Sequence, residues 1–300
     1  MNIANQTLRS GRHPDTAPSS LLEIDPADNG ALLGQIGSLQ ARLVRDPAEL
    51  DAAQRLRYRV FSEEMGSSFS HDSAAADRDE DCFDAVCDHL IVVDTTLAGG
   101  AADQIVGTYR LLRDEVAQRA GGFYSASEYA IDALVARHRG KRFLELGRSC
   151  VMPAYRSKRT IELLWQGIWA YCLRHEIDVM VGCASFPGAV AQMHALPLTF
   201  LHQHARAAGE WAVDAATQDA VSMDMMPEEA IDMKAALMAM PPLIKGYLRL
   251  GAKFADTAVI DRAFGSTDVM VILPVATISE RYVRYYGADA GRFAPGARTA

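Results

Sequence analysis

The stretch that most constrains the fold is residues 143–184, which has the pattern of a strand, a helix and a second strand in succession. Phe143–Met152 is the first strand, and Pro153 ends it. Thr160–His175 follows as a helix whose apolar residues recur at helical spacing. Asp178–Ala184 is a short apolar run that is typical of a buried strand. The apolar face of the helix consists of Ile161, Leu164, Trp165, Ile168 and Cys172. This succession favours a sheet covered by helices.

The remaining segments extend this pattern into one mixed sheet. Asp46-Pro47-Ala48-Glu49 begins a helix, with Asp46 as the N-cap and Glu49 completing a capping box. The other expected strands are Leu39–Leu43, His89–Asp94, Ile105–Leu112, Ala258–Asp261 and Thr267–Leu273. Further helices are expected at residues 188–207 and Ile278–Tyr286. We therefore predict an α/β chain with a mobile N-terminal arm at 1–37, a single domain at 38–300 and a helical insertion at about 209–250.

The composition excludes several classes of protein. The chain has 300 residues, of which 49% are hydrophobic and 23% charged, so it is not wholly disordered, collagen-like or a coiled coil. No run approaches the roughly 18–20 apolar residues of a membrane-spanning helix, and the N-terminus lacks a secretory signal pattern. Five cysteines without a paired CxxC spacing favour free thiols in the cytoplasm. The net charge of −8 argues against nucleic-acid binding.

Charge is segregated along the chain. Between Asp77 and Asp88 there are six acids and one base, whereas between Arg137 and Arg159 there are eight bases and one acid. Such blocks are often two solvated loops. Two opposed blocks also fit two different ligands, one cationic and one anionic, and we favour this second interpretation.

Two arginines have two possible placements each. Arg57 falls beside the apolar stripe of the first helix, so its side chain either extends to solvent at the helix end or carries a charge inward. Arg110 lies on a strand face, where it either points to solvent or is buried in a bidentate pair with Asp81 or Asp84 at a pocket. The pattern alone leaves these alternatives open.

Glu145-Leu-Gly-Arg148 lies within the strand at 143–152. Positions three apart in a regular strand face opposite sides of the sheet. Gly147 is a natural site for a bulge, and one extra residue would bring Glu145 and Arg148 to the same face. A bulge in a central strand also exposes backbone N–H groups that could bind an oxyanion. The alternative is a surface Glu–Arg pair, which contributes little.

The segment Val151–Thr160 is a basic loop that leads into a helix. A helix N-terminus beside Arg156, Ser157, Lys158 and Arg159 is suited to a phosphate. The loop lacks the glycines that let backbone wrap a pyrophosphate, so a single phosphate is favoured over a dinucleotide-type ligand. A basic helix cap with no ligand is the alternative.

Other chemistry-bearing residue types carry no predicted site. Cys150 and Cys183 lie in apolar strands, where cysteine is most often a small core residue. Cys82, Cys87 and His89 have irregular spacing for zinc. We therefore expect neither a metal site nor a cysteine nucleophile.

Four motifs in order resemble the GNAT acyltransferase fold, over about residues 39–274. The chain is more closely similar to the acyl-homoserine-lactone (autoinducer) synthases and to the related ornithine N-alpha-acyltransferases. The motifs are Arg57-Tyr-Arg-Val-Phe61, Asp81-Cys-Phe-Asp84 with His89-Leu90, Gly107-Thr-Tyr-Arg-Leu-Leu112 and Glu145-Leu-Gly-Arg148. Longer strings resemble the ornithine branch, among them Gly182-Cys-Ala-Ser-Phe-Pro187 and Pro241-Pro-Leu-Ile-Lys-Gly-Tyr247. Ser67 stands where the autoinducer synthases carry an aromatic residue, which counts against lactone synthesis.

The resemblance implies transfer of a 3-hydroxyacyl group from acyl carrier protein to the α-amino group of L-ornithine, which gives lyso-ornithine lipid. Glu145 is then the candidate base, and Arg148 and Arg110 would orient carboxylates. The expected ornithine-binding residues are Asp81, Asp84, Asp88, Arg57 and Phe61. The carrier protein and its phosphopantetheine would contact Arg156, Ser157, Lys158 and Arg159.

No cofactor is required beyond the acyl carrier protein as co-substrate, and the lipid product implies a peripheral contact with the inner membrane. Three alternatives stay open at this point. They are a lactone-type acyltransferase, an acetyl-CoA-dependent acetyltransferase, and a non-catalytic protein that binds membranes or acyl carriers.

Overall fold

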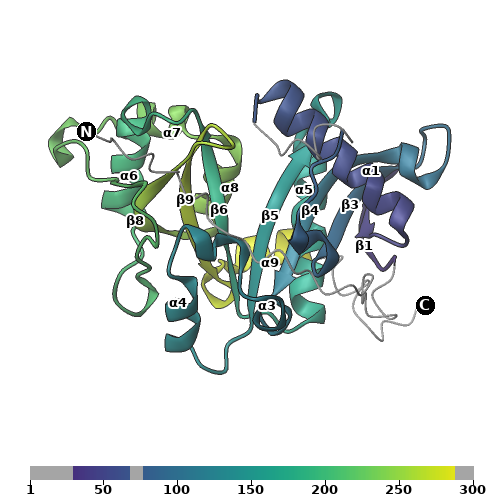
Figure 1. The fold of residues 1–300 in the computed structure, drawn as a ribbon, viewed down its shortest axis with the longest axis horizontal. Coiled ribbons are helices and arrows are strands. Elements are labelled where there is room, and N and C mark those ends of the chain that lie inside the picture. The colour runs from purple at the N-terminus through teal and green to yellow at the C-terminus, as the bar shows by residue number, and fades with distance from the viewer. Residues whose placement is uncertain (1–29, 68–76, 288–300) are drawn as a thin grey trace, which may run out of the picture.

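The computed structural model describes residues 30–67 and 77–287. Within them, nine strands form one mixed sheet in the order β1-β2-β3-β4-β5-β6-β9-β8-β7 (Figure 1). The strands are β1 Leu32–Ile36, β2 Leu39–Leu43, β3 Asp88–Asp94, β4 Ile105–Arg113, β5 Phe143–Val151, β6 Val179–Pro187, β7 Ala220–Ser222, β8 Lys253–Asp261 and β9 Ser266–Pro274. β5 and β6 are parallel, and the other neighbours are antiparallel. The predicted mixed sheet is confirmed.

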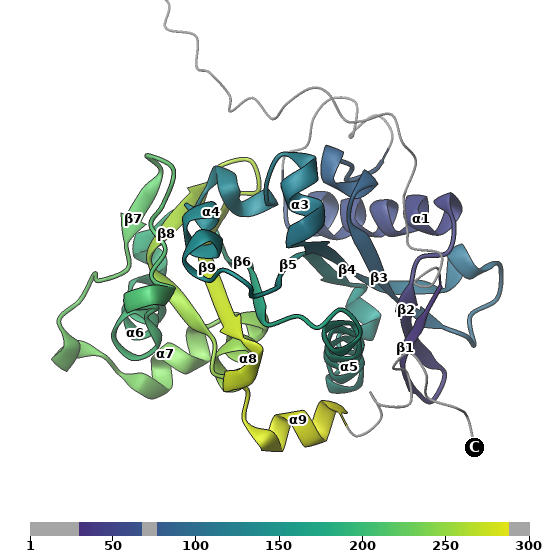
Figure 2. The same cartoon turned by 90° about the horizontal axis from the view of Figure 1, so that it is seen from below.

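Helices cover both faces of this sheet (Figure 2). The helices are α1 Pro47–Tyr58, α3 Asp114–Ala120, α4 Ile131–Arg137, α5 Lys158–Arg174, α6 Ala195–Ala205, α7 Met233–Ala239, α8 Pro242–Leu250 and α9 Glu280–Gly287. The alternation of side chains along β9 shows the two layers. Val269, Val271 and Leu273 belong to the core beneath α5, α6 and α8, whereas Met270 and Ile272 belong to the core beneath α3 and α4. In the described part of the chain, no helix is both long and apolar enough to span a membrane.

The start of α1 follows the predicted cap only in part. Asp46 accepts a hydrogen bond from the backbone N–H of Glu49 at 3.0 Å, as an N-cap should. The Glu49 side chain does not complete a capping box, because it forms a buried pair with Arg42 at 2.6 and 2.7 Å instead. A buried arginine on β2 needs a carboxylate partner, and this need prevails over the local cap.

Two predictions about chain organisation need correction. The predicted arm at 1–37 is wrong for residues 32–36, since β1 pairs with β2 and buries Leu33. Gly34 and polar neighbours hide the strand pattern of this segment; residues 1–29 lie outside the described part. The predicted helical insertion at 209–250 contains α7 and α8, but it also contains β7 and extended backbone. Pro227 lies at one of the breaks, where proline limits helix propagation.

β5 and β6 separate soon after they pair. Their parallel register covers only Phe143 to Glu145 opposite Val179 to Val181. At the next residue, Gly182 has a φ of +151°, and a Cβ there would lie 2.3 Å from the carbonyl oxygen of Leu146. Only glycine lets the two backbones approach so closely and then diverge. The divergence is visible in Figure 1 as the opening between β5 and β6.

Gly182→Ala is expected to lower the free energy of unfolding by about 2–3 kcal/mol, because the added methyl group would clash with backbone and adopt an unfavourable φ. Urea denaturation measures the change. Gly246→Ala is the contrasting variant, since its Cβ would lie 3.9 Å from the nearest neighbouring atom inside α8, where alanine is favoured by about 1 kcal/mol. Equal urea midpoints for Gly182→Ala and the wild type would show that the separation of the strands does not depend on this glycine.

Candidate active site

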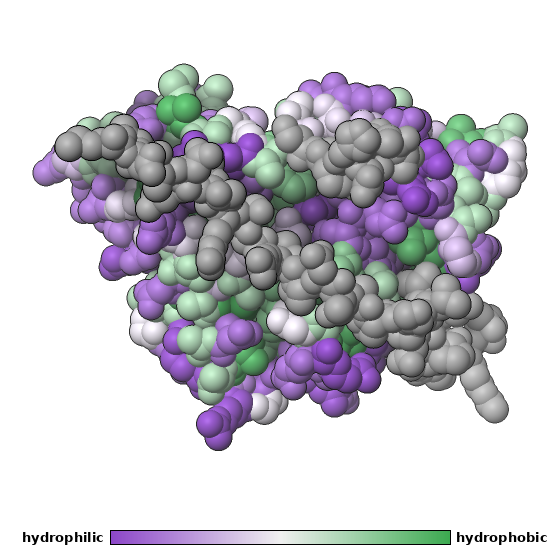
Figure 3. Space-filling view, in the orientation of Figure 1, coloured by the Kyte–Doolittle hydropathy of each residue, from purple (hydrophilic) through white to green (hydrophobic). Residues whose placement is uncertain are grey.

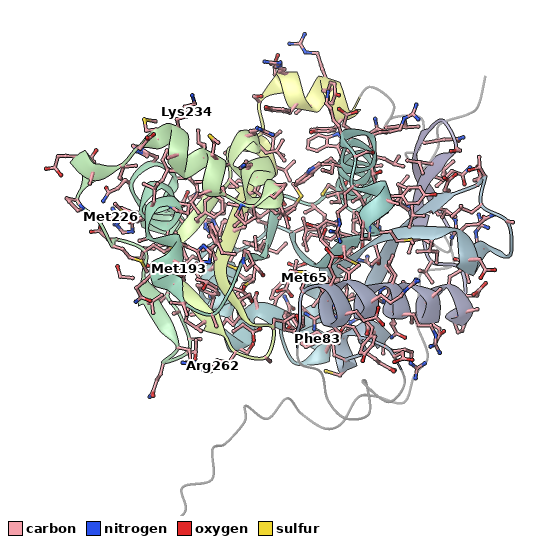
Figure 4. The ribbon with its side chains drawn as sticks, turned by 90° about the horizontal axis from the view of Figure 1, so that it is seen from above. Met65, Phe83, Met193, Met226, Lys234 and Arg262 are labelled. Atoms are coloured by element: carbon pink, nitrogen blue, oxygen red, sulfur yellow. The ribbon has the colours of Figure 1, made fainter. Side chains whose placement is uncertain are left out.

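A cavity of about 580 Å³ lies where β5 and β6 diverge. The outline of the molecule is notched at the top of the space-filling view, between its two halves (Figure 3). The walls of the cavity come from β4, β5, β6, α5 and α8. The helical turn Arg59–Glu64 that continues α1 and the turn between β8 and β9 complete them. Met65, which lines the cavity, lies near the middle of the molecule in Figure 4. The cavity therefore collects residues from segments that are far apart in sequence.

Beside the cavity, the acidic block is folded onto three arginines. Arg57 contacts Asp79 at 2.9 Å and both carboxylate oxygens of Asp84 at 2.7 and 2.8 Å. Arg110 donates through one nitrogen to Asp81 at 2.6 Å and to Asp84 at 3.3 Å. Arg148 donates to Asp79 at 3.0 Å and to Asp81 at 3.2 Å. We call this set the arginine–aspartate network: Arg57, Arg110, Arg148, Asp79, Asp81 and Asp84.

The network resolves the alternatives left open for Arg57 and Arg110. Arg57 carries its charge inward and is fully buried, and Arg110 is 3% exposed. Arg110 is not bidentate to a single carboxylate, because one nitrogen bridges two. Burial alone would raise the pKa of Asp84, but Arg57 and Arg110 hold it well below its usual range. Three carboxylates thus face three guanidinium groups, and the network is electrically balanced.

This balance argues against the predicted use of the acidic block by a cationic ligand. Asp84 is 3% exposed and is already paired with two arginines. Asp81 is also paired, and neither residue lines the cavity. Asp88 lies elsewhere, at the start of β3, where it accepts a hydrogen bond from the Tyr171 hydroxyl at 2.5 Å. The geometry therefore does not bring Asp81, Asp84 and Asp88 together as an ornithine site.

The predicted bulge is present in β5. Thr108 pairs with Cys150 and Arg110 with Gly147, so β5 has one residue more than β4 between these pairs. The residue with the left-handed backbone is Arg148, with a φ of +50°, rather than Gly147. Glu145 and Arg148 both line the cavity and both bind the segment at Tyr124, as the prediction of a common face required.

Glu145 is anchored by backbone N–H groups rather than by Arg148. Its two carboxylate oxygens accept hydrogen bonds from the backbone of Tyr124 at 2.7 Å and of Ser125 at 2.8 Å. Arg148 donates to the Tyr124 hydroxyl at 3.1 Å. Burial raises the pKa of Glu145, and the N–H donors of Ser125 and Tyr124 oppose that rise. A fixed carboxylate with a raised pKa in a cavity can accept a proton from an amine.

The predicted basic loop lies at the edge of the cavity. Arg156 and Ile161 line the cavity on either side of Ser157, Lys158 and Arg159, which do not. Ser157 caps α5 by accepting the N–H of Thr160 at 3.3 Å. Arg156 donates to both carboxylate oxygens of Glu64, and its Nη2 atom lies 2.6 Å from Oε2. Lys158 pairs with Glu162 at 3.2 Å. These cations thus have protein partners, yet they remain at the surface beside the opening.

One part of the cavity is apolar. Of the five residues on the predicted apolar face of α5, all but Cys172 line it. On the facing side are residues of the segment before and within α8: Pro241, Pro242, Leu243 and Gly246. Phe61 also lines the cavity, and its ring meets the edge of Phe264 with centroids 6.1 Å apart. An apolar lining of this kind suits a hydrocarbon chain.

Cys150 and Cys183 line the cavity as well, although they were not predicted as nucleophiles. Burial raises the pKa of Cys150 to about 12 and that of Cys183 well above its usual value. The nucleophilic form of cysteine is the thiolate, and burial disfavours it here. The structure therefore agrees with treating both as structural residues.

Sequence reasoning missed three acidic residues in the cavity. Glu128, Asp261 and Asp268 place their carboxylate oxygens within 4.8 Å of one another, and all three line the cavity. Burial, followed by the charge of Asp268, raises the pKa of Glu128 to about 8. Burial also raises the pKa of Asp268 to about 6. The one available signal was Asp268, an ionisable residue within an otherwise apolar strand.

This chain is similar in sequence to a known family and to several proteins of known name. Residues 56–166, which include the whole network and the bulge, match the family described as "Acetyltransferase (GNAT) domain". The chain is 58% identical to the L-ornithine N(alpha)-acyltransferase of Rhizobium meliloti (strain 1021), over 93% of this chain and 94% of that protein. It is 58% identical to the protein of the same name from Brucella abortus (strain 2308), over 89% and 96%. Among solved structures, FeeM, an N-acyl amino acid synthase from uncultured soil microbes, is 15% identical with a TM-score of 0.48, over 79% and 91%.

Proposed function

Because the chain belongs to the L-ornithine N(alpha)-acyltransferase family and is an N-acyltransferase of the GNAT type, we propose that it transfers a 3-hydroxyacyl group from acyl carrier protein to the α-amino group of L-ornithine. The product is lyso-ornithine lipid. The observation that carries this proposal is one cavity that holds both Glu145 and Arg148 at a bulged strand and an apolar wall between α5 and α8. Transfer of a fatty acyl group requires both parts.

In the proposed reaction, the neutral α-amine attacks the thioester carbonyl carbon. A C–N bond forms and the C–S bond breaks, so that the thiol of the carrier leaves. Glu145 accepts the proton that the amine loses, directly or through a water molecule. Gly147, Arg148 and Ser149 line the cavity at the bulge, where backbone N–H groups would stabilise the negative charge on the thioester oxygen. No covalent bond to the enzyme is needed.

The arginines take positioning roles in this scheme. Arg148 lines the cavity and donates three of its five N–H groups to Asp79, Asp81 and the Tyr124 hydroxyl, so it would offer the other two to the α-carboxylate of the amino acid. Arg110 also lines the cavity, but Asp81 and Asp84 engage it on the network side. Arg57 is fully buried, so it would act only by holding the network in place.

The acyl donor would approach over the N-terminus of α5. Acyl carrier proteins are acidic and present a single phosphodiester on phosphopantetheine, which suits a helix N-terminus with Arg156, Lys158 and Arg159 nearby. The apolar lining formed by α5 and α8 lies next to that end, because Ile161 belongs to the first turns of α5. We further propose a cytoplasmic enzyme that contacts the inner membrane peripherally when it releases its lipid product.

The test is an acylation assay with the purified chain and ornithine. A 3-hydroxyacyl carrier protein and the matching 3-hydroxyacyl-CoA are offered separately, and thiol release is followed with and without amine while the product is identified by mass. We expect amine-dependent thiol release with the carrier-linked donor and formation of N-acyl-ornithine. If thiol release depends on amine but occurs only with the CoA-linked donor, the assignment of acyl carrier protein as the donor is wrong. If thiol is released equally without amine, the assignment of ornithine as the acceptor is wrong.

Charge reversal at the loop tests the docking site. Arg156→Glu and Lys158→Glu should each raise the apparent KM for the acyl carrier protein by about 3- to 10-fold and flatten its salt dependence, because each removes an attraction to an acidic partner. Lys234→Glu makes the same change in charge on α7, outside the cavity lining (Figure 4), and should leave KM unchanged. If all three variants behave alike, the carrier docks elsewhere.

A further inference from the structure

Three carboxylates in the cavity have no role in the reaction described above. Glu128 follows the turn Tyr124–Ser127, Asp261 ends β8, and Asp268 lies on β9. Their oxygens lie within 4.8 Å of one another. We call these residues the acidic trio: Glu128, Asp261 and Asp268.

The acidic trio differs from the arginine–aspartate network in its lack of compensating charge. Among the described residues, no lysine or arginine forms an ion pair with any of the three, whereas each aspartate of the network has a guanidinium partner. Burial and mutual repulsion raise the pKa of both Glu128 and Asp268. Glu145 adds to the repulsion on Glu128, whereas the hydroxyl groups of Ser185 and Ser266 and then the charge of Arg148 oppose the raised pKa of Asp268 only in part. A cation would stabilise this arrangement.

Hydrogen bonding points to the same conclusion. Asp268 is 6% exposed, and its Oδ1 atom is buried without a hydrogen-bond partner in the described part of the chain. The other two members are engaged by neutral donors. Glu128 accepts a hydrogen bond from the Cys183 thiol at 3.3 Å, and Asp261 accepts the backbone N–H groups of Ala263 and Phe264 at 2.8 and 2.9 Å. A buried carboxylate oxygen with no donor is unfavourable unless a ligand supplies one.

The acidic trio lies close to Arg148 and Glu145, which would contact the α-carboxylate and the α-amine of the acceptor. Phe264, whose N–H binds Asp261, stacks its ring against Arg148, with the guanidinium carbon 4.6 Å from the ring centroid. Glu128 follows the segment Tyr124–Ser125 that anchors Glu145. The trio, Arg148 and Glu145 also line the same cavity, so one small ligand inside it would meet all of these groups.

We propose that the acidic trio binds the side-chain ammonium group of the amino-acid acceptor and thereby selects a diamino acid. The inference rests on the proposed function, since it assigns the second amine of ornithine to these carboxylates while the α-amine faces Glu145. Three methylene groups separate the α-carbon of ornithine from that second amine. An ammonium group has three N–H donors, one of which would satisfy Asp268. The trio also explains regioselectivity, because an ammonium held by carboxylates stays protonated and cannot attack the thioester.

Acceptor kinetics test the proposal. Ornithine is compared with norvaline, which has the same carbon chain without the second amine, in Asp268→Asn and Glu128→Gln. Each variant should raise the KM for ornithine by about 10- to 100-fold, the range for loss of a charge-assisted contact, and change the use of norvaline by less than about 2-fold. Asp256→Asn on β8 is the matched control, because Asp256 is exposed. A preserved preference for ornithine in both trio variants would overturn the assignment.

Ligand-induced stabilisation gives a second readout that needs no acyl donor. Ornithine should raise the Tm of the wild type and of Asp256→Asn but not of Asp268→Asn, and norvaline should raise none of them. Without ligand, neutralising one member should leave Tm equal or higher, since it relieves repulsion. If ornithine stabilises the wild type but no donor supports its acylation, the proposed function fails and the binding site stands.

A divalent cation is the competing occupant, because three clustered carboxylates are also typical metal ligands. The assay is therefore repeated after treatment with EDTA and after addition of Mg²⁺ or Ca²⁺. Unchanged ornithine kinetics support the ammonium site. Loss of activity with EDTA and its recovery with a metal would overturn it in favour of a metal site.

Discussion

Arg57→Met is expected to lower the free energy of unfolding by about 3–5 kcal/mol, because it leaves buried carboxylates without their main partner. Arg57 is fully buried and makes three side-chain contacts of 2.7 to 2.9 Å to Asp79 and Asp84. Methionine fills much of the same volume but donates no hydrogen bond. Asp84 would then keep one guanidinium contact, from Arg110 at 3.3 Å, beside the neutral donors of Gln54 at 3.2 Å and of the Asp81 backbone at 3.1 Å. Among the three arginines of the network, Arg57 makes the most contacts to the aspartate carboxylates.

Urea denaturation at pH 7 measures the loss, with Arg55→Met as the control. Arg55 lies on the same helix, and its side chain is 50% exposed in a pair with Asp51. Exposed pairs contribute about 0.2–1 kcal/mol, so the control should change little. If Arg57→Met loses as little stability as Arg55→Met, the stability of the fold does not depend on the buried network.

The loss of unfolding free energy in Arg57→Met should depend on pH in a defined direction. Arg57 and Arg110 lower the pKa of Asp84 below its unfolded value, which is about 3.9 for an aspartate. The contribution of this carboxylate to stability is therefore fully present above the unfolded pKa and is lost as the pH falls toward the folded pKa. Arg57→Met removes most of that contribution. The difference in unfolding free energy between wild type and variant should thus narrow as the pH is lowered from 7 to 3.

Local sequence signals predicted the features that depend on local geometry. Gly147 between Glu145 and Arg148 indicated a bulge, and the register of β4 with β5 confirms an extra residue there. The spacing of Leu164, Trp165 and Ile168 indicated a helix with one apolar face, and that face lines the cavity. Such signals suffice because neighbouring residues decide backbone conformation and the direction of side chains.

Pairing over long distances could not be predicted in the same way. The acidic block at Asp79–Asp84 reads equally well as a ligand site or as the partner of Arg57, which lies 22 residues before Asp79 and 27 before Asp84. Only the packing of α1 against β4 places Arg57 and Arg110 beside those carboxylates. The acidic trio is harder still, because Glu128 and Asp268 come from distant segments that meet only in the fold, where the Tyr129 hydroxyl donates to the Asp268 carbonyl. Asp268 within an apolar strand was the one local hint.

Glu145→Gln is expected to reduce turnover by about 10²–10⁴, the usual effect of removing a positioned base. Glutamine has nearly the same shape but cannot accept a proton as a carboxylate does. It can accept only one of the two backbone hydrogen bonds that Tyr124 and Ser125 donate to Glu145. Turnover and stability must therefore be measured together, with Glu229→Gln on the surface as the matched control.

The pH–rate profile separates a base from a scaffold. A base works only when it is deprotonated, so the wild-type rate should fall as the pH drops through the raised pKa of Glu145. In Glu145→Gln the fall of the rate that is due to protonation of Glu145 should disappear. The remaining rate should rise with pH, because more of the α-amine is then neutral. Near-normal turnover with an unchanged profile would contradict the assignment. Glu145 would then serve only to hold the Tyr124–Ser125 turn, and with it the hydroxyl that Arg148 binds, so the amine would lose its proton to solvent before attack.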